Sequence, residues 1–147
     1  MNNKQIEIIL NSLQPVELHG YILETFYEPI KIIKDNIARG LKSMKLPIAD
    51  EDLLKIKTTF MRYEMVVDRN LNSEEILLNE LIQKQMIHNQ FEVVIESQQK
   101  EMELANVLLE ILDHSEATCQ IYDLLRQLIY KTEDRIDITK HYLNKNE

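Results

Sequence analysis

The sequence predicts an all-α protein, a single domain of residues 1–147 folded as a bundle of five to seven helices. Glycine (2) and proline (3) are scarce among the 147 residues, although together they make up about 12% of an average chain. A β-rich fold needs such residues to turn its strands, so their shortage argues against one. Apolar residues amount to 44% and are spread along the whole chain, which disfavours disorder. Much of the chain repeats these residues every three or four positions, the period of a helix.

Two helices are expected before Pro29. The first covers about 3–12. The second begins at Pro15, because a residue without an N–H fits the first turn of a helix, and it runs to about Tyr27. Pro29 predicts a kink or a break, since its ring crowds the carbonyl group four residues earlier.

Two further helices complete the N-terminal half. One covers 30–44 and ends ahead of Pro47, with its apolar residues on a single face. The next covers about 51–69 and begins after Asp50, a plausible N-cap. Asn72–Glu75 then resembles a capping box, which predicts that another helix starts there.

The C-terminal half predicts a long antiparallel hairpin of helices 73–113 and 116–143. Residues 73–113 contain no glycine or proline and space their apolar side chains as a coiled coil does. Unbroken, this helix would be about 60 Å long, more than the width of a compact domain of this size. Either it projects and pairs with another chain, or it breaks in 96–101, which holds no apolar residue.

The net charge of −8 is unevenly distributed along the chain. Residues 74–123 hold 2 basic and 11 acidic side chains, whereas residues 31–45 hold 5 basic and 1 acidic one. An acidic segment repels phosphates and suits a cation or a basic protein surface. The sequence therefore predicts one acidic helix and one basic helix.

The basic helix is a candidate partner-binding face. Four of its lysines fall within about 60° of one another on the helical wheel, opposite the apolar stripe, and are expected to be exposed. No aromatic side chains alternate with them, so we expect a protein partner rather than nucleic acid. Phe91 lies in the apolar stripe of 77–95 that the last helix is too short to cover, and is expected to contact a partner. The four lysines are Lys31, Lys34, Lys42 and Lys45.

Acidic residues on helix 73–113 form a candidate metal site. Glu103, Glu110 and Asp113 share one face, and carboxylates at this spacing are suitable ligands for Mg²⁺. Glu110–Asp113 resembles the E-x-x-D half of the metal motif of all-α NTP pyrophosphohydrolases. That family also needs an E-x-x-E motif, which the chain lacks. The favoured interpretation is a solvated helix face.

Arg135 and His141 form a candidate catalytic pair. They resemble the Arg-x4–6-His motif on the last helix of HEPN-type RNases. That resemblance implies a metal-independent RNase in which Arg135 binds phosphate and His141 acts as acid or base. The favoured interpretation is a solvated terminal turn whose basic residues complement the helix dipole.

The function that this sequence favours is a non-enzymatic protein–protein interaction protein of adaptor, immunity or regulatory type. Every candidate active site is incomplete, and several methionines supply adaptable apolar contacts. We expect no cofactor, a homodimer formed through the long hairpin, and a cytoplasmic location, because no apolar stretch long enough for a membrane span occurs. A hydrolase acting on RNA or on nucleotides is the alternative.

Overall fold

The protein is a helical bundle. Its computed structural model describes residues 1–43, 50–83, 88–112 and 119–145, and these ranges contain helices and no strand. The prediction of an all-α fold is thereby confirmed. The helices are α1 (Asn3–Ser12), α2 (Pro15–Ile22), the π-helical turn η1 (Leu23–Tyr27), α3 (Glu28–Ser43), α4 (Asp50–Ile82), α5 (His88–Leu112) and α6 (Cys119–Lys145).

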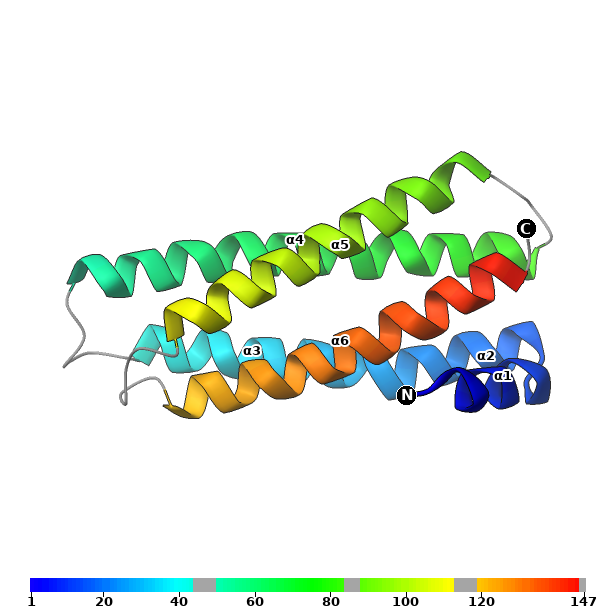
Figure 1. Cartoon of the computed structure of the whole chain (residues 1–147), viewed down its shortest axis with the longest axis horizontal. Coiled ribbons are helices and arrows are strands. Elements are labelled where there is room, and N and C mark those ends of the chain that lie inside the picture. The colour runs from blue at the N-terminus through cyan, green and yellow to red at the C-terminus, as the bar shows by residue number, and fades with distance from the viewer. Residues whose placement is uncertain (44–49, 84–87, 113–118, 146–147) are drawn as a thin grey trace.

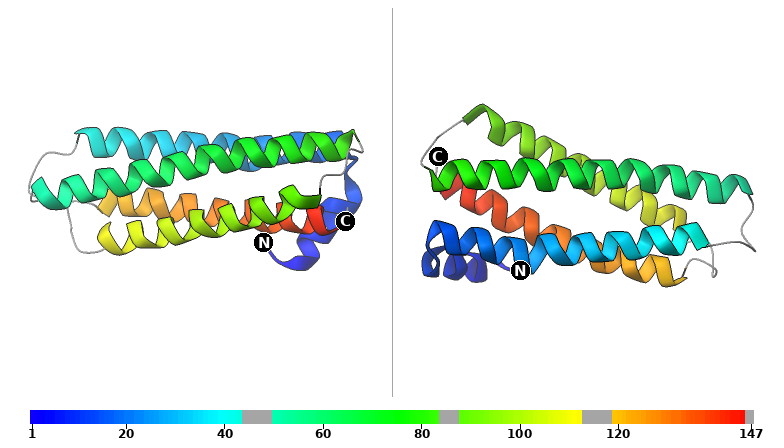
Figure 2. Two further views of the ribbon diagram at one scale, coloured as in Figure 1. Left: turned by 90° about the horizontal axis from the view of Figure 1, so that it is seen from above. Right: turned by 180° about the vertical axis from the view of Figure 1, so that it is seen from behind.

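Four long rods alternate in direction around one core. The first rod is the continuous run α2–η1–α3, and the others are α4, α5 and α6 (Figure 1). Contacts join α3 to α6, α6 to α5, α5 to α4, and α4 to α2 and α3, so the rods close a ring. The short α1 packs against α6 outside this ring, as the two further views show (Figure 2).

The helix boundaries differ from the predicted hairpin of 73–113 and 116–143. Helix α4 continues through Asn72–Glu75 to Ile82, because nothing between residues 50 and 82 is a glycine or proline that would stop it. Of the two alternatives for this helix, a break in 96–101 does not occur, since α5 is continuous there. The expected helix 73–113 is therefore divided between the last third of α4 and all of α5.

Pro29 is accommodated by a π-helical turn rather than by a break. The N–H of Glu28 bonds to the carbonyl of Leu23, five residues earlier. Proline has no N–H to offer the carbonyl of Thr25, its partner in a regular α-helix. The Lys131 ammonium of α6 donates to this carbonyl at 3.4 Å, so a side chain replaces the missing backbone donor.

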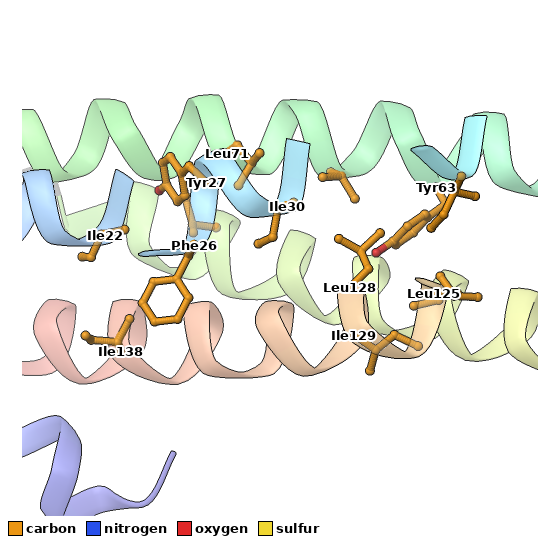
Figure 3. Close-up of a cluster of buried hydrophobic side chains, with 14 of the residues drawn as sticks. Ile22, Phe26, Tyr27, Ile30, Tyr63, Leu71, Leu125, Leu128, Ile129 and Ile138 are labelled. Atoms are coloured by element: carbon orange, nitrogen blue, oxygen red, sulfur yellow. The ribbon is translucent and has the colours of Figure 1, made fainter. Parts of the chain in front are cut away.

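The π-helical turn also brings two neighbouring aromatic residues into the core. Phe26 and Tyr27 are each 1% exposed. Phe26 points towards α6 beside Ile138, whereas Tyr27 points towards α4 beside Leu71 (Figure 3). This turn thus lets one rod fill the space against two different neighbours.

A proline in the middle of α5 tests whether this helix is continuous. Gln99→Pro should lower the free energy of unfolding by about 3 kcal/mol or more, because it removes a helical hydrogen bond at an exposed position. Gln99→Ala is the control and should change it by less than about 0.5 kcal/mol. Urea denaturation measures both, and a proline variant as stable as the alanine variant would favour a break in 96–101.

Candidate functional site

Three helices carry polar residues in their inward-facing rows. Each row has the 3–4 spacing of a packing seam, and each is apolar except in its middle. The row of α4 holds Asn70 and Glu74, that of α5 holds Gln98 and Glu101, and that of α6 holds Thr132, Arg135 and Thr139; all seven side chains are buried.

Arg135 lies between two carboxylates and binds each of them with two nitrogen atoms. Its Nε and Nη2 donate to Glu74 at 3.0 and 2.9 Å, and its Nη1 and Nη2 donate to Glu101 at 3.0 and 2.6 Å. None of the three side chains has any exposed surface. We call Glu74, Glu101 and Arg135 the charged cluster. Two-point contacts of this kind are the strongest and most directional ion pairs.

Neutral side chains supply further donors to the two carboxylates. The hydroxyls of Tyr27 and Thr139 each lie 3.4 Å from Oε1 of Glu74. The amide of Asn70 donates to Oε1 of Glu101 at 2.8 Å. Tyr27 reaches the cluster because the π-helical turn directs it towards α4 (Figure 3). The rod α2–η1–α3 is thus joined to the same network as the other three rods.

The cluster keeps its arginine charged and Tyr27 protonated. Burial alone would lower the pKa of Arg135, but the charges of Glu74 and Glu101 hold this pKa above its ordinary value. Burial, and then the negative charge of Glu74, raise the pKa of the Tyr27 hydroxyl above its ordinary value. The Tyr27 hydroxyl therefore stays protonated at neutral pH and can donate a hydrogen bond.

Glu74 is a carboxyl group of the cluster whose pKa is raised by its surroundings. Two carboxylates and one guanidinium leave a net charge of −1 without contact with water. Complete burial raises the pKa of Glu74 above its ordinary value of 4.5, Arg135 opposes this rise, and Glu101 adds to it. Protonation of Glu74 would neutralise the cluster.

This arrangement ties helices together and leaves no access for a substrate. Four of the five N–H groups of Arg135 are accounted for by carboxylate oxygens, and no atom of the three side chains reaches the surface. A buried ion pair adds little net stability compared with apolar packing, but it penalises every register in which one partner is missing. The cluster is suited to specifying how α4, α5 and α6 align.

The two residues of the candidate catalytic pair point in different directions from α6. Arg135, expected to bind phosphate, is 0% exposed and already saturated by Glu74 and Glu101. His141 lies half-buried on α6 with its Nδ1 2.7 Å from the carbonyl oxygen of Asp137. Six residues at 100° each place the two side chains about 120° apart around the helix. Arg135 is therefore a buried core residue, which corrects the favoured interpretation that it lies on a solvated terminal turn.

The residues of the candidate metal site lie on the outer face of α5. Glu103 and Glu110 are exposed, and Asp113 lies outside the described residues. Within the ranges that the structure describes, no three histidine, cysteine or acidic side chains are grouped so as to hold a metal ion.

The predicted basic face of α3 is only partly exposed. Lys31 and Lys42 are exposed, and Lys45 lies outside the described residues. Lys34 is buried, which corrects the prediction, and its ammonium lies 2.7 Å from Asp68 and 3.6 Å from Glu64. Burial alone would lower the pKa of Lys34, but the hydrogen bond that it donates to Asp68, together with the negative charges of Asp68, Glu64 and Asp35, holds this pKa above its ordinary value. Lys34 therefore joins α3 to α4 within one chain.

Phe91 is a core residue and not a surface contact. It is 3% exposed and belongs to the same core as Leu77 and Leu78 of α4, which are equally inaccessible. The expected homodimer relied in part on the apolar stripe of 77–95 being uncovered. Helices α4 and α5 cover that stripe against each other, so this argument for a dimer no longer holds.

Comparison with known proteins adds no relative from which a function can be transferred. No family model, curated protein or solved structure matches the chain. In the described part of the chain, no helix combines the length and the apolar character that crossing a bilayer requires.

Sequence reasoning missed the charged cluster, although a signal for it is present. Glu74 falls in the apparent capping box and Glu101 in the apolar-free stretch 96–101, so neither is expected in the buried row of a continuous helix. In rows drawn through whole helices, Tyr63, Val67, Asn70, Glu74 and Leu77 keep a regular 4–3 spacing, and Arg135 occupies the same kind of position on α6. Opposite charges in the apolar rows of separate helices indicate a buried ion pair.

Removal of the arginine tests the energetic role of the cluster. Arg135→Met should lower the free energy of unfolding by about 3–5 kcal/mol, because two buried carboxylates lose their counter-charge. Adding Glu74→Gln and Glu101→Gln should recover most of this loss, since the amides keep their acceptor oxygens but carry no charge. Arg126→Met, an exposed site on the same helix, is the control for chemical denaturation. Equal losses in Arg135→Met and Arg126→Met would contradict the assignment.

The raised pKa of Glu74 predicts a pH dependence with a definite sign. Between pH 4.5 and the raised pKa of Glu74, the folded state binds more protons than the unfolded state. The free energy of unfolding therefore falls as the pH rises. The wild type should therefore lose stability relative to Glu74→Gln with rising pH, by at most about 1.4 kcal/mol per pH unit. Denaturation of both proteins from pH 4.5 to 8 measures this difference. A difference that is constant, or that favours the wild type at high pH, would contradict the prediction.

Proposed function

We propose that this protein acts without catalysis, as a helical adaptor or regulatory protein that binds another protein. The observation that carries the proposal is a row of large apolar side chains on the outer face of α4. Leu54, Met61 and Met65 are 66%, 58% and 67% exposed. The bundle already has its core on the opposite face of this helix, at Ile56, Phe60 and similar positions.

The spacing of the row supports a helical partner. The three residues fall within about 40° of one another at 100° per residue, so they form one stripe along α4. Single exposed apolar residues are normal on a protein surface, but an aligned set of large ones is typical of interaction faces. Methionine side chains are unbranched and adapt to different partner surfaces. We call Leu54, Met61 and Met65 the α4 row.

The hydrolase alternative receives no support from the geometry. A phosphate-binding arginine must be able to meet its substrate, whereas Arg135 is enclosed by two carboxylates. Opening the cluster would leave Glu74 and Glu101 buried without a counter-charge. The proposal of a binding function requires no such rearrangement.

Affinity capture with matched variants tests the proposal. The full chain, immobilised, should retain a partner from a lysate of the source organism. The triple variant Leu54→Gln, Met61→Gln and Met65→Gln should lose at least 90% of the bound partner, since each lost apolar contact weakens binding several-fold. Quantitative mass spectrometry of the retained proteins measures this.

The control carries the same chemical change on other helices. Ile32, Val93 and Val107 are 59%, 64% and 46% exposed, and their replacement by glutamine should leave capture unchanged. Both variants must melt as the wild type does. No retained protein that depends on the α4 row, or equal losses in both variants, would reject the proposed function.

A further inference from the structure

We infer that the α4 row binds an amphipathic helix of another protein, and that this helix carries acidic side chains beside its apolar stripe. This inference rests on the proposed function and adds the chemistry of the partner. Its basis is the charge along one edge of the row, because charged residues beside an apolar seam determine which helix can pair with it.

The outer face of α4 follows the spacing of a coiled-coil seam. Positions 54, 58, 61, 65, 68 and 72 are separated by alternating steps of four and three. The α4 row occupies three of them, and the polar residues Thr58, Asp68 and Asn72 occupy the others. Each residue that directly follows 54, 61 and 68 flanks the seam on the side of α5. These flanking residues, seven apart, are Lys55, Arg62 and Arg69, and all three are exposed. We call them the basic edge.

The basic edge is not neutralised within the part of the chain that the structure describes. Among the described residues, no carboxylate forms an ion pair with Lys55, Arg62 or Arg69. Arg69 makes one long hydrogen bond, 3.4 Å, to the hydroxyl of Ser97 on α5, and this bond confirms which side of α4 the edge occupies.

The α3 side of the seam is partly neutralised. Glu64 flanks the seam on this side, Asp68 lies in the seam itself, and both face the ammonium of Lys34. Lys34 therefore balances one of their two negative charges, whereas the basic edge carries three positive ones. The free charge beside the α4 row is positive, although the whole chain has a net charge of −8.

A second copy of the chain does not suit this seam. In a two-fold antiparallel pairing of α4 with its copy, identical edges meet, so Arg62 and Arg69 would face arginines. In a parallel pairing, Arg62 would face Lys57 of the copy, and only Arg69 would face a carboxylate, that of Glu64, which already lies beside Lys34. A partner helix with glutamate or aspartate at seven-residue spacing forms favourable pairs with the whole edge.

Two synthetic peptides provide the test. Both are helices about three heptads long with the same leucine seam, and they differ only in glutamate or lysine at the flanking positions. Fluorescence anisotropy of the labelled peptides with the full chain measures binding. The acidic peptide should bind about tenfold more tightly at low salt, as expected for three exposed ion pairs, and the ratio should shrink in high salt. Net charge alone would favour the basic peptide.

Charge reversal on the protein locates the effect. Lys55→Glu, Arg62→Glu and Arg69→Glu together should invert the preference, and the neutral glutamine version should abolish it. The matched control reverses Lys31, Arg39 and Lys42, three exposed cations of α3, and should retain a preference for the acidic peptide. This control also tests the α3 face as an alternative site.

Three results would overturn the inference. These are equal binding of the two peptides, a preference of the wild type for the basic peptide, and an equal response of the α3 control. Sedimentation that shows a dimer abolished by glutamine at the α4 row would identify a second copy as the occupant and would also overturn it. Capture that depends on the α4 row, together with no charge preference, would leave the proposed function standing and reject only the acidic partner.

Discussion

The two-sided contact of Arg135 with Glu74 and Glu101 is the constraint on which the bundle depends. Apolar rows with 3–4 spacing can slide past one another by a turn and still bury their side chains. A guanidinium that binds two carboxylates with two nitrogens each has one satisfactory position. Because the three partners come from α4, α5 and α6, a slip of any of these helices leaves a charge buried without its counterpart.

The class of fold was predictable and the assignment of its helices was only partly so. Scarce glycine and proline and a helical apolar period were sufficient for an all-α bundle. The boundary at Asn72–Glu75 was misplaced because a capping motif is a local pattern, whereas α4 is stabilised there by the burial of Leu71, Leu77 and Leu78. Continuity of α5 through 96–101 follows from the cluster, since Glu101 satisfies its charge by contact with α6, and a sequence does not display such long-range pairing.

The candidate site residues illustrate the same limit. Arg135 and Lys34 were treated as surface cations because charged residues are rarely buried without a partner. Arg135 is paired with Glu74 and Glu101, and Lys34 is paired with Asp68 and Glu64. These partners come from other helices, so no residue nearby in the sequence indicates that the two cations are buried. The outer face of α4 was not predicted either, although the expected helix 51–69 contains Leu54, Met61 and Met65, because exposed apolar residues are common on helix surfaces.

The π-helical turn η1 shifts the buried positions of the first rod by one residue. Buried positions 18, 22 and 26 belong to one helical row, and buried positions 27, 30, 34, 37 and 41 belong to another that is displaced by one residue. A rod without this extra residue would follow a single row and face one neighbour along its length. The displaced row lets the rod present Phe26 to α6 and Tyr27 to α4 (Figure 3). One extra residue therefore lets a continuous helical rod pack against two different neighbours. The contact with the second neighbour includes the hydroxyl of Tyr27, which lies beside Glu74.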